Sequence, residues 1–233
     1  MQVKPNRLHV PSVLLLLAAA VAPAVAADTT IGGVAVALPP PAGFCELSEA
    51  EPSDHEMVVV MSGLIEKTGN KLLGLSADCQ QLADWRSGRR ALLDDYAQFQ
   101  TPSAQIDQLI TSPQASIQQV CSALREQGSR ILANVVGDVK TNIEAALKNV
   151  KMNEASFVGV LAEDDTACYS AQVQKMQAQN GTDKTQIGLV AITVVKRKFV
   201  FVDRMSVYVD ADATSALLAK VQATVAALYA ANN

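Results

Sequence analysis

The sequence predicts an α+β domain with a mainly antiparallel sheet packed by helices. Two runs rich in Val, Ile, Phe and Tyr, residues 186–195 and 199–209, are separated only by a short basic joint. A joint this short cannot cross over the sheet, so the two runs must form an antiparallel hairpin. A long helical pattern over 113–150 precedes them, and a shorter one follows from 210. This separation of strand-rich and helix-rich stretches is typical of the α+β class.

The first 26 residues have the parts of a secretory signal peptide. Lys4 and Arg7 supply a positive start, residues 13–22 form an apolar run, and Ala24-Val25-Ala26 offers small residues for cleavage. The run is short for a membrane anchor, which is the alternative interpretation. We therefore expect cleavage after Ala26, a mature single domain over 27–233, and a periplasmic or secreted location without stable membrane insertion.

The next segments alternate between strand and helix. The extended segment 31–38 should stop at Pro39-Pro40-Pro41, because proline lacks the donor that a central strand needs. Ser53 and Glu56 have the spacing of a capping box, so a helix should begin there. It should end at residues 68–70. The segments expected next are a strand over 71–79, a helical turn within 80–90, and either a strand or a helix over 92–100.

The second half begins with the longest element. Ser112-Pro113 is a helix start, and apolar residues keep helical register to Val150. Gly128 and Gly137 weaken the pattern, so either one helix or two helices with a kink is expected. The segments expected next are strands over 156–161 and 166–176, a turn at 180–182, and the hairpin described above. A final helix should follow, with Asp210 or Asp212 as its N-cap. Its apolar stripe is Leu217, Leu218, Val221, Val225 and Leu228.

The four cysteines, Cys45, Cys79, Cys121 and Cys168, predict two disulfides in an exported chain. Their spacing excludes a CxxC redox pair and a zinc knuckle. Three pairings are open. A strand–helix–strand unit tends to bring its strands close together, which favours Cys45–Cys79 and leaves Cys121–Cys168 by elimination.

Composition excludes several function classes. Acidic side chains outnumber basic ones, 23 to 19, and aromatic residues make up 4% of the chain. A chain of this kind is a poor nucleic-acid binder. No phosphate loop or dinucleotide fingerprint is present, so no cofactor is expected. Ser76 lacks the second glycine of a nucleophile elbow.

Two acidic clusters are candidates for metal or catalytic sites. His55 lies between Asp54 and Glu56, but zinc needs three or four ligands and no second histidine remains after cleavage. Glu163-Asp164-Asp165 lacks the ligand pattern of a calcium loop and is expected to be a solvated turn. The sequence therefore predicts no metal site and no catalytic residue. A hydrolase using Asp164 and Asp165 as a carboxylate pair stays as an alternative, since such pairs leave no motif.

One group of residues is a candidate partner surface: Trp85, Arg86, Arg89 and Arg90. In the competing interpretation, which we favour, Trp85 is buried and the arginines form ion pairs with Asp84, Asp94 or Asp95. The basic joint at 196–198 is expected to be solvated. Surface-facing glutamines are expected as well, namely Gln98, Gln118, Gln119, Gln172, Gln174 and Gln177.

Both ends of the chain resemble a known family. The opening Val34 to Cys45 (VAVALPPPAGFC) and the closing hairpin with its helix resemble PsbP-like domains, a group that includes DcrB-like envelope proteins. Ala77-Asp78-Cys79 followed by Trp85-Arg86 is similar to a segment of exported bacterial proteins. The resemblance implies an α/β/α sandwich and a non-enzymatic binding or accessory role. We therefore expect a non-catalytic envelope protein that binds another envelope protein, or alternatively a chaperone or adaptor for an exported protein.

Overall fold

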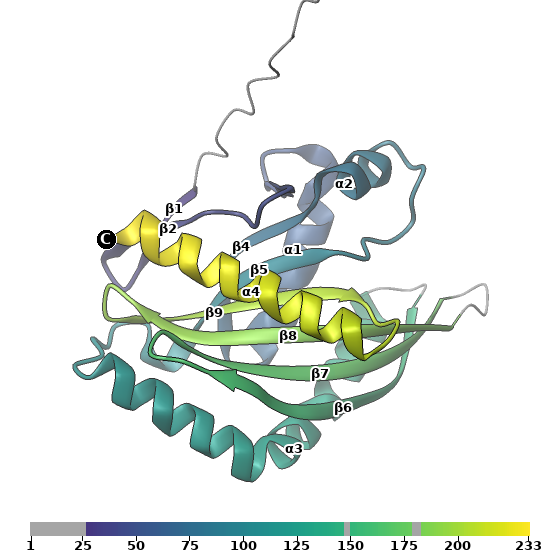
Figure 1. The fold of residues 1–233 in the computed structure, drawn as a ribbon. Coiled ribbons are helices and arrows are strands. Elements are labelled where there is room, and N and C mark those ends of the chain that lie inside the picture. Colours follow the sequence, from purple (N-terminus) through teal and green to yellow (C-terminus); the bar gives the residue numbers. More distant parts are fainter. Residues whose placement is uncertain (1–26, 147–149, 179–182) are drawn as a thin grey trace, which may run out of the picture.

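A seven-stranded antiparallel sheet forms the centre of the molecule (Figure 1). The computed structural model describes residues 27–146, 150–178 and 183–233. The α+β class with a mainly antiparallel sheet is confirmed, while the predicted signal peptide and the turn at 180–182 lie outside the described residues. The strands of the sheet are, in chain order, β3 (Phe44–Glu46), β4 (Asn70–Asp78), β5 (Tyr96–Pro102), β6 (Val150–Glu163), β7 (Ala167–Ala178), β8 (Asp183–Val195) and β9 (Lys198–Val207). In space their order is β3-β4-β5-β9-β8-β7-β6.

Helices cover both faces of this sheet. On one face lie α4 (Ala211–Asn232) and a small separate hairpin of β1 (Ala27–Ile31) and β2 (Val34–Leu38). On the other face α3 (Pro113–Ala146) packs on β6, β7 and β8, and α1 (Pro52–Lys67) packs on β4. The remaining helical elements are α2 (Cys79–Arg86) and a short 3-10 turn at Ser103–Gln105. The layers are therefore α/β/α.

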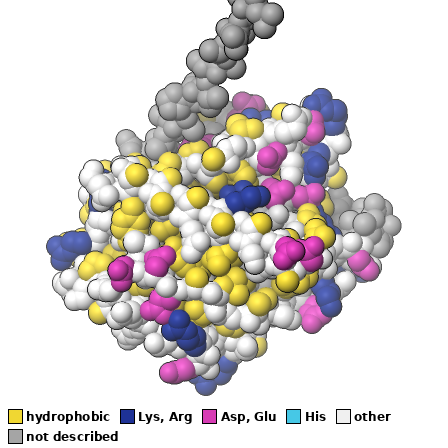
Figure 2. Space-filling view, viewed as in Figure 1, with side chains coloured by type: hydrophobic (Ala, Val, Ile, Leu, Met, Phe, Trp, Pro, Cys, Tyr) yellow, Lys and Arg dark blue, Asp and Glu magenta, His cyan; other side chains and the backbone are white. Residues whose placement is uncertain are grey.

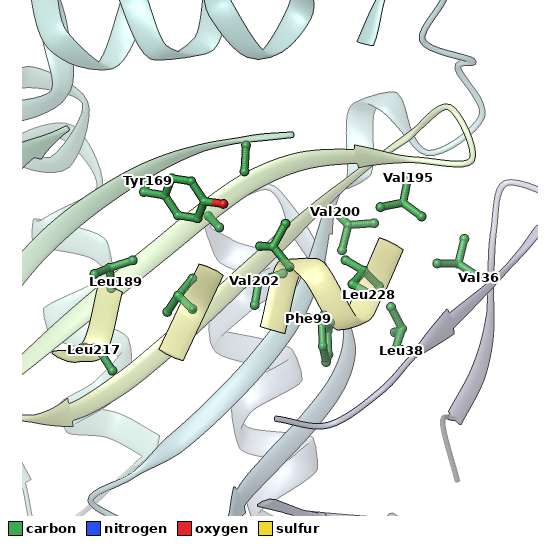
Figure 3. Close-up of a cluster of buried hydrophobic side chains, with 14 of the residues drawn as sticks. Val36, Leu38, Phe99, Tyr169, Leu189, Val195, Val200, Val202, Leu217 and Leu228 are labelled. Carbon is green, nitrogen blue, oxygen red and sulfur yellow. The ribbon is translucent and has the colours of Figure 1, made fainter. Parts of the chain in front are cut away.

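The largest hydrophobic cluster fills the space between the sheet, α4 and the β1–β2 hairpin (Figure 3). The predicted stripe of the last helix supplies Leu217, Val221, Val225 and Leu228, all of them buried. Asp210 caps this helix as expected, and its carboxylate accepts a hydrogen bond from Ala213 N at 2.9 Å. At the other end of the helix, the side chain of Asn232 bonds both main-chain groups of Ala37 in β2, so α4 holds the hairpin in place.

Two expectations for the first part of the chain are wrong. The extended segment is a hairpin rather than one strand, because Gly32 and Gly33 have φ of +50° and +79° and turn the chain back. The capping box does not form either. Glu51 is the N-cap of α1 and makes no side-chain cap bond, while the hydroxyl of Ser53 points to Glu51 and Asp54. Pro52 starts the helix instead.

The long helix α3 is one helical element over Pro113–Ala146, and neither Gly128 nor Gly137 interrupts it. Gly128 has a different role. A Cβ added there would lie 2.3 Å from the ring of Phe157 in β6, so the missing side chain lets the helix approach the strand.

Replacing Gly128 with alanine is expected to lower the free energy of unfolding by about 1 kcal/mol, because the ring of Phe157 must move to make room. Gly63→Ala in α1 is the matched control. A Cβ at Gly63 meets nothing within 4 Å, so alanine there is expected to raise stability by about 0.5–1 kcal/mol through helix propensity. Urea denaturation of both variants checks the pair. Equal signs for the two changes would contradict this role for Gly128.

Polar residues expected on the surface are partly buried instead. Lys198 is 1% exposed, and its ammonium donates to Ile106 O and Gln108 O, so this end of the basic joint anchors a loop rather than being solvated. Gln98 is 4% exposed and accepts a weak hydrogen bond from Gln100 on the sheet face that carries α1 and α3. Both corrections have one cause: neighbours distant in sequence cover these side chains.

The structure contains two disulfides, Cys45–Cys79 and Cys121–Cys168, which are the two pairs favoured from the sequence. The first joins β3 to the start of α2, next to the pairing of Cys45 with Ala77 across β3 and β4. The second joins α3 to β7, and both of its cysteines are fully buried. Two disulfides are consistent with an exported protein.

Candidate binding site

The arginines of the candidate partner surface bind carboxylates of their own chain. Arg89 pairs with Asp84 at 2.6 Å and Arg90 pairs with Asp94 at 2.9 Å. Trp85 is half-buried and packs against the cluster of Leu47, Val58, Leu75, Ala77 and Leu82. The pairs of Arg89 and Arg90 match the favoured interpretation of the sequence, whereas Trp85 is only half-buried and Arg86 has a partner that was not expected, Asp54. These contacts leave the side chains less suited to capture a partner.

Arg86 makes the most buried of these ion pairs. Its Nε and Nη2 donate to the two carboxylate oxygens of Asp54 at 2.9 and 2.5 Å, and the Asp54 side chain is fully buried. Burial acts to raise the pKa of Asp54. The hydrogen bonds from Arg86 and from Ser48 N outweigh burial and hold the pKa of Asp54 below its ordinary value. The pair therefore ties α2 to the first turn of α1.

Arg86→Ala is expected to lower the free energy of unfolding at pH 7 by about 3 kcal/mol, because it leaves a buried charge without its partner. Arg89→Ala is the control, since its ion pair is exposed and is expected to leave stability nearly unchanged. Because the pKa of Asp54 is lowered in the folded state, the contribution of the pair is present at neutral pH and is lost as pH falls through that lowered pKa. Urea denaturation at pH 7 of both variants checks the prediction, and equal losses would contradict it.

Asp164 and Asp165, the alternative catalytic pair, hold a turn. One oxygen of Asp164 accepts hydrogen bonds from Thr166 N, Thr166 Oγ1 and Ala167 N, and the other accepts one from the hydroxyl of Tyr169. Asp165 accepts a bond from Gln114 of α3. Burial acts to raise the pKa of Asp164, yet these bonds lower it below the ordinary value. The carboxylate of Asp164 is thus saturated by its own turn.

Three observations bear on metal binding and membrane insertion. His55 is exposed on the first turn of α1. Residues 27–146, 150–178 and 183–233 hold no group of three or more His, Cys, Asp or Glu positioned to bind a metal ion. Within the same residues, no helix has the length and apolarity needed to span a bilayer. On the part of the α4 face that the structure describes, acidic and basic side chains are interspersed (Figure 2).

One open site is a groove along the free edge of β4, which we call the edge groove. It encloses about 320 Å³. It is lined by residues of β2, β3, α1, β4, β5 and the loops between them, namely Leu38, Pro40, Glu46, Leu47, Ser48, Glu49, Val58, Ser62, Leu72, Leu73, Gly74, Leu75, Ser76 and Phe99.

The edge groove exists because β3 is much shorter than β4. β3 pairs only with residues 76–78 of β4, and one further bond joins Leu47 N to Leu75 O. Beyond that point the chain turns away into the loop before α1. From Asn70 to Gly74, β4 therefore pairs with β5 on one side and has no strand partner among the described residues on the other.

The groove has two apolar walls and an acidic rim. Leu38, Leu73 and Phe99 belong to the cluster under α4, whereas Leu72 and Val58 belong to the cluster under α1. Glu46 and Glu49 supply the charges, and no lysine or arginine is among the described residues that line the groove. The hydroxyl of Ser76, 3% exposed, has no hydrogen-bond partner in this part of the structure.

A second, smaller pocket of about 110 Å³ lies between α1 and the loop before β5. Its lining is mostly apolar, with Met57, Met61 and Met176 among the side chains, and Lys184 at one side forms an ion pair with Asp94. Methionine side chains adapt readily to irregular spaces. Because Asp94 already pairs with Lys184, this pocket offers a ligand fewer unpaired polar side chains than the edge groove does.

A buried carboxylate lies in the middle of the sheet. Asp203 of β9 is 9% exposed, lies opposite Gln98 of β5, and its Oδ1 has no hydrogen-bond partner among the described residues. Burial raises the pKa of Asp203 to about 7. The same burial, with the charge of Asp203, raises the pKa of Tyr96. Asp203 does not line the edge groove.

The groove residues were missed from the sequence. Glu46, Ser48 and Ser62 belong to no motif, and the groove depends on the different lengths of two paired strands. One signal was present: Pro39-Pro40-Pro41 predicts that the chain leaves extended pairing just before β3. A short strand after such a break leaves the longer neighbour exposed.

Comparison with known proteins gives little further information. No family model matches the chain, and no curated protein matches it. Among solved structures, the chain is similar to the Saccharomyces cerevisiae Ran-binding protein Mog1p, with 12% identity and a TM-score of 0.29 over 89% of this chain and 92% of that one. At that identity and TM-score the match supports no statement about what this chain binds.

Proposed function

We propose that the chain is a non-catalytic accessory protein of the periplasm or the secreted fraction, and that it holds a segment of another exported protein in the edge groove. The observation that carries this proposal is the groove itself: an open, mostly apolar channel beside a strand edge that has no partner from Asn70 to Gly74. An uncovered strand edge is a template for pairing with another chain, and proteins normally cover it. A groove of this kind suits an adaptor or chaperone for an exported protein.

Two further observations support the proposed location outside the cytoplasm and the proposed lack of a catalytic role. Two disulfides form and persist in oxidising compartments outside the cytoplasm. The carboxylate pair of the hydrolase alternative is engaged in a turn, with four hydrogen bonds accepted by Asp164. A general acid or base needs a proton that it can exchange with a substrate, which this arrangement does not favour.

The proposal is tested by filling the groove. Ser62 of α1 lines the edge groove, so Ser62→Trp is expected to block it without changing charge. Ser122→Trp, at an exposed position of α3, is the matched control. Each tagged protein is expressed in cells that export it, and the co-purifying proteins are quantified by mass spectrometry. We expect at least one exported protein that wild type and Ser122→Trp retain and Ser62→Trp loses tenfold or more. Identical sets for the two variants would overturn the proposal.

A further inference from the structure

We propose that the segment held in the edge groove is an extended, lysine- or arginine-bearing peptide that adds to the sheet as a new strand beside β4. This inference rests on the proposed function and specifies the chemistry of the partner. It joins three features of the groove: the direction of the free main-chain groups, the two apolar walls, and the unpaired acidic rim.

The main-chain groups of β4 point the right way for strand addition. Leu75 O accepts from Leu47 N on the side of β3, whereas Asp78 N donates to Asp95 O on the side of β5. Strand residues alternate in this way along the sheet. Between Leu72 and Gly74 the register shifts, so Leu73 has no partner residue in β5. This bulge leaves the main chain of Leu73 outside the existing ladder.

The free stretch sets the length of the added segment. β3 ends its pairing at Ser76, and β4 begins at Asn70, so a strand continuing the line of β3 would cover about four or five residues. At about 3.3 Å per residue this corresponds to roughly 15 Å of extended chain. A helix could not satisfy the main-chain groups of β4, because it bonds its own.

The two apolar walls of the groove define where the side chains of the added strand would lie. Side chains of a strand alternate between the two faces of a sheet. On the α4 face the added strand would meet Leu38, Leu73 and Phe99, and on the α1 face it would meet Val58 and Leu72. An apolar side chain entering between these residues loses contact with water, which favours binding.

The acidic rim of the groove defines the charge that the bound peptide should carry. Glu46 and Glu49 are exposed at the groove, and neither forms an ion pair with a lysine or arginine of the described residues. Two uncompensated carboxylates beside the path of the peptide attract a basic side chain and repel an acidic one. Since both are exposed, the preference should weaken as salt is added.

The test uses a defined probe, an acetylated and amidated hexapeptide of alternating valine and lysine. It is titrated into the disulfide-bonded mature protein, residues 27–233, and followed by NMR amide shifts, which detect weak binding. We expect saturable shifts centred on residues 71–75. The corresponding valine–glutamate peptide should cause none. N-methylation of alternate peptide amides should abolish binding, because those amides pair with β4. Glu46→Gln with Glu49→Gln should weaken binding about threefold at low salt.

The variants separate this inference from the proposed function. Binding of the valine–lysine peptide should be lost in Ser62→Trp and kept in Ser122→Trp. If Ser62→Trp does not fold, Ser48→Trp, also in the groove lining, replaces it. Peptide binding that survives N-methylation, or that no groove variant changes, would overturn strand addition. If the valine–lysine peptide does not bind but Ser62→Trp still loses a co-purifying protein, the proposed function stands and strand addition is wrong. If capture is unchanged by the groove variant, both are wrong.

Discussion

Replacing both Cys121 and Cys168 with alanine is expected to lower the free energy of unfolding by about 4 kcal/mol, the largest loss that we expect from any change described here. The two cysteines are 47 residues apart, so the bond removes much of the freedom of the unfolded chain. Both are also fully buried, and they join α3 to β7 of the sheet. The substitution should therefore also loosen the packing of Ile117 and Val194 in the same cluster.

The control is the other disulfide. Cys45 and Cys79 are 34 residues apart, which gives a similar entropic contribution, but Cys45 is exposed and contributes little packing. We expect the double alanine variant at Cys121 and Cys168 to lose more stability than the one at Cys45 and Cys79, as measured by guanidinium denaturation. We also expect a mild reductant to open Cys45–Cys79 in the folded protein first. A greater loss for the exposed pair would contradict this account.

Asp203→Asn is expected to raise the free energy of unfolding at pH 8 by as much as ~4 kcal/mol. Burial raises the pKa of Asp203 from an ordinary value of 3.8 to about 7, and each pKa unit corresponds to ~1.4 kcal/mol. The folded protein binds a proton that the unfolded chain has released between these two values, so the stability of the wild type falls as pH rises from 3.8 to about 7. Asparagine has no charge to bury, and the variant escapes that loss.

The pH dependence separates this effect from a general change in packing. At pH 4 the carboxyl of Asp203 is largely protonated in the folded wild type and carries little charge, so the variant and the wild type should differ little. At pH 8 the difference should reach its full size. Urea denaturation of the two proteins at pH 4, 6 and 8 measures it. A difference that is the same at all three pH values would show that the charge of Asp203 is not the cause.

Periodicity predicted the order of elements in the second half of the fold, but the helical pattern was extended too far: Val150 begins β6, whereas the strand was expected only from residue 156. The stripe of α4 is buried as expected, because Leu217, Val221 and Leu228 lie on one face of the helix whatever it packs against. The hairpin of β8 and β9 followed from the short joint between them, which allows no other connection. Local patterns of this kind need no knowledge of distant neighbours.

Expectations failed where distant neighbours decide the outcome. The Ser53–Glu56 spacing fits a capping box, yet Asp54 is drawn to Arg86, and Glu51 becomes the N-cap. The lysine at 198 fits a solvated turn, yet the carbonyls of Ile106 and Gln108 surround its ammonium. A pattern over a few residues contains no information about such partners.

In the candidate site too, contacts between residues close along the chain could be predicted, and features that depend on distant residues could not. The partners of Arg89 and Arg90 could be assigned from the sequence, because Asp84 and Asp94 are close along the chain. The partner of Arg86, Asp54, is distant along the chain and was not predicted. The edge groove could not be predicted, because it depends on β3 ending after three residues while β4 continues for nine. Relative strand length becomes visible only once the pairing is known.

The most direct test of the account is photo-cross-linking at Ser48, an exposed residue of the edge groove. A photoreactive benzoylphenylalanine is placed at Ser48, or at Ser122 of α3 as the control, and the cells that export the protein are irradiated. If the edge groove binds a partner, Ser48 should give a discrete adduct with another exported protein. That adduct should be absent from Ser122 and lost when Ser62→Trp is added. Adducts of equal yield from the two positions, or an adduct at Ser48 that Ser62→Trp leaves unchanged, would contradict a binding role for the edge groove.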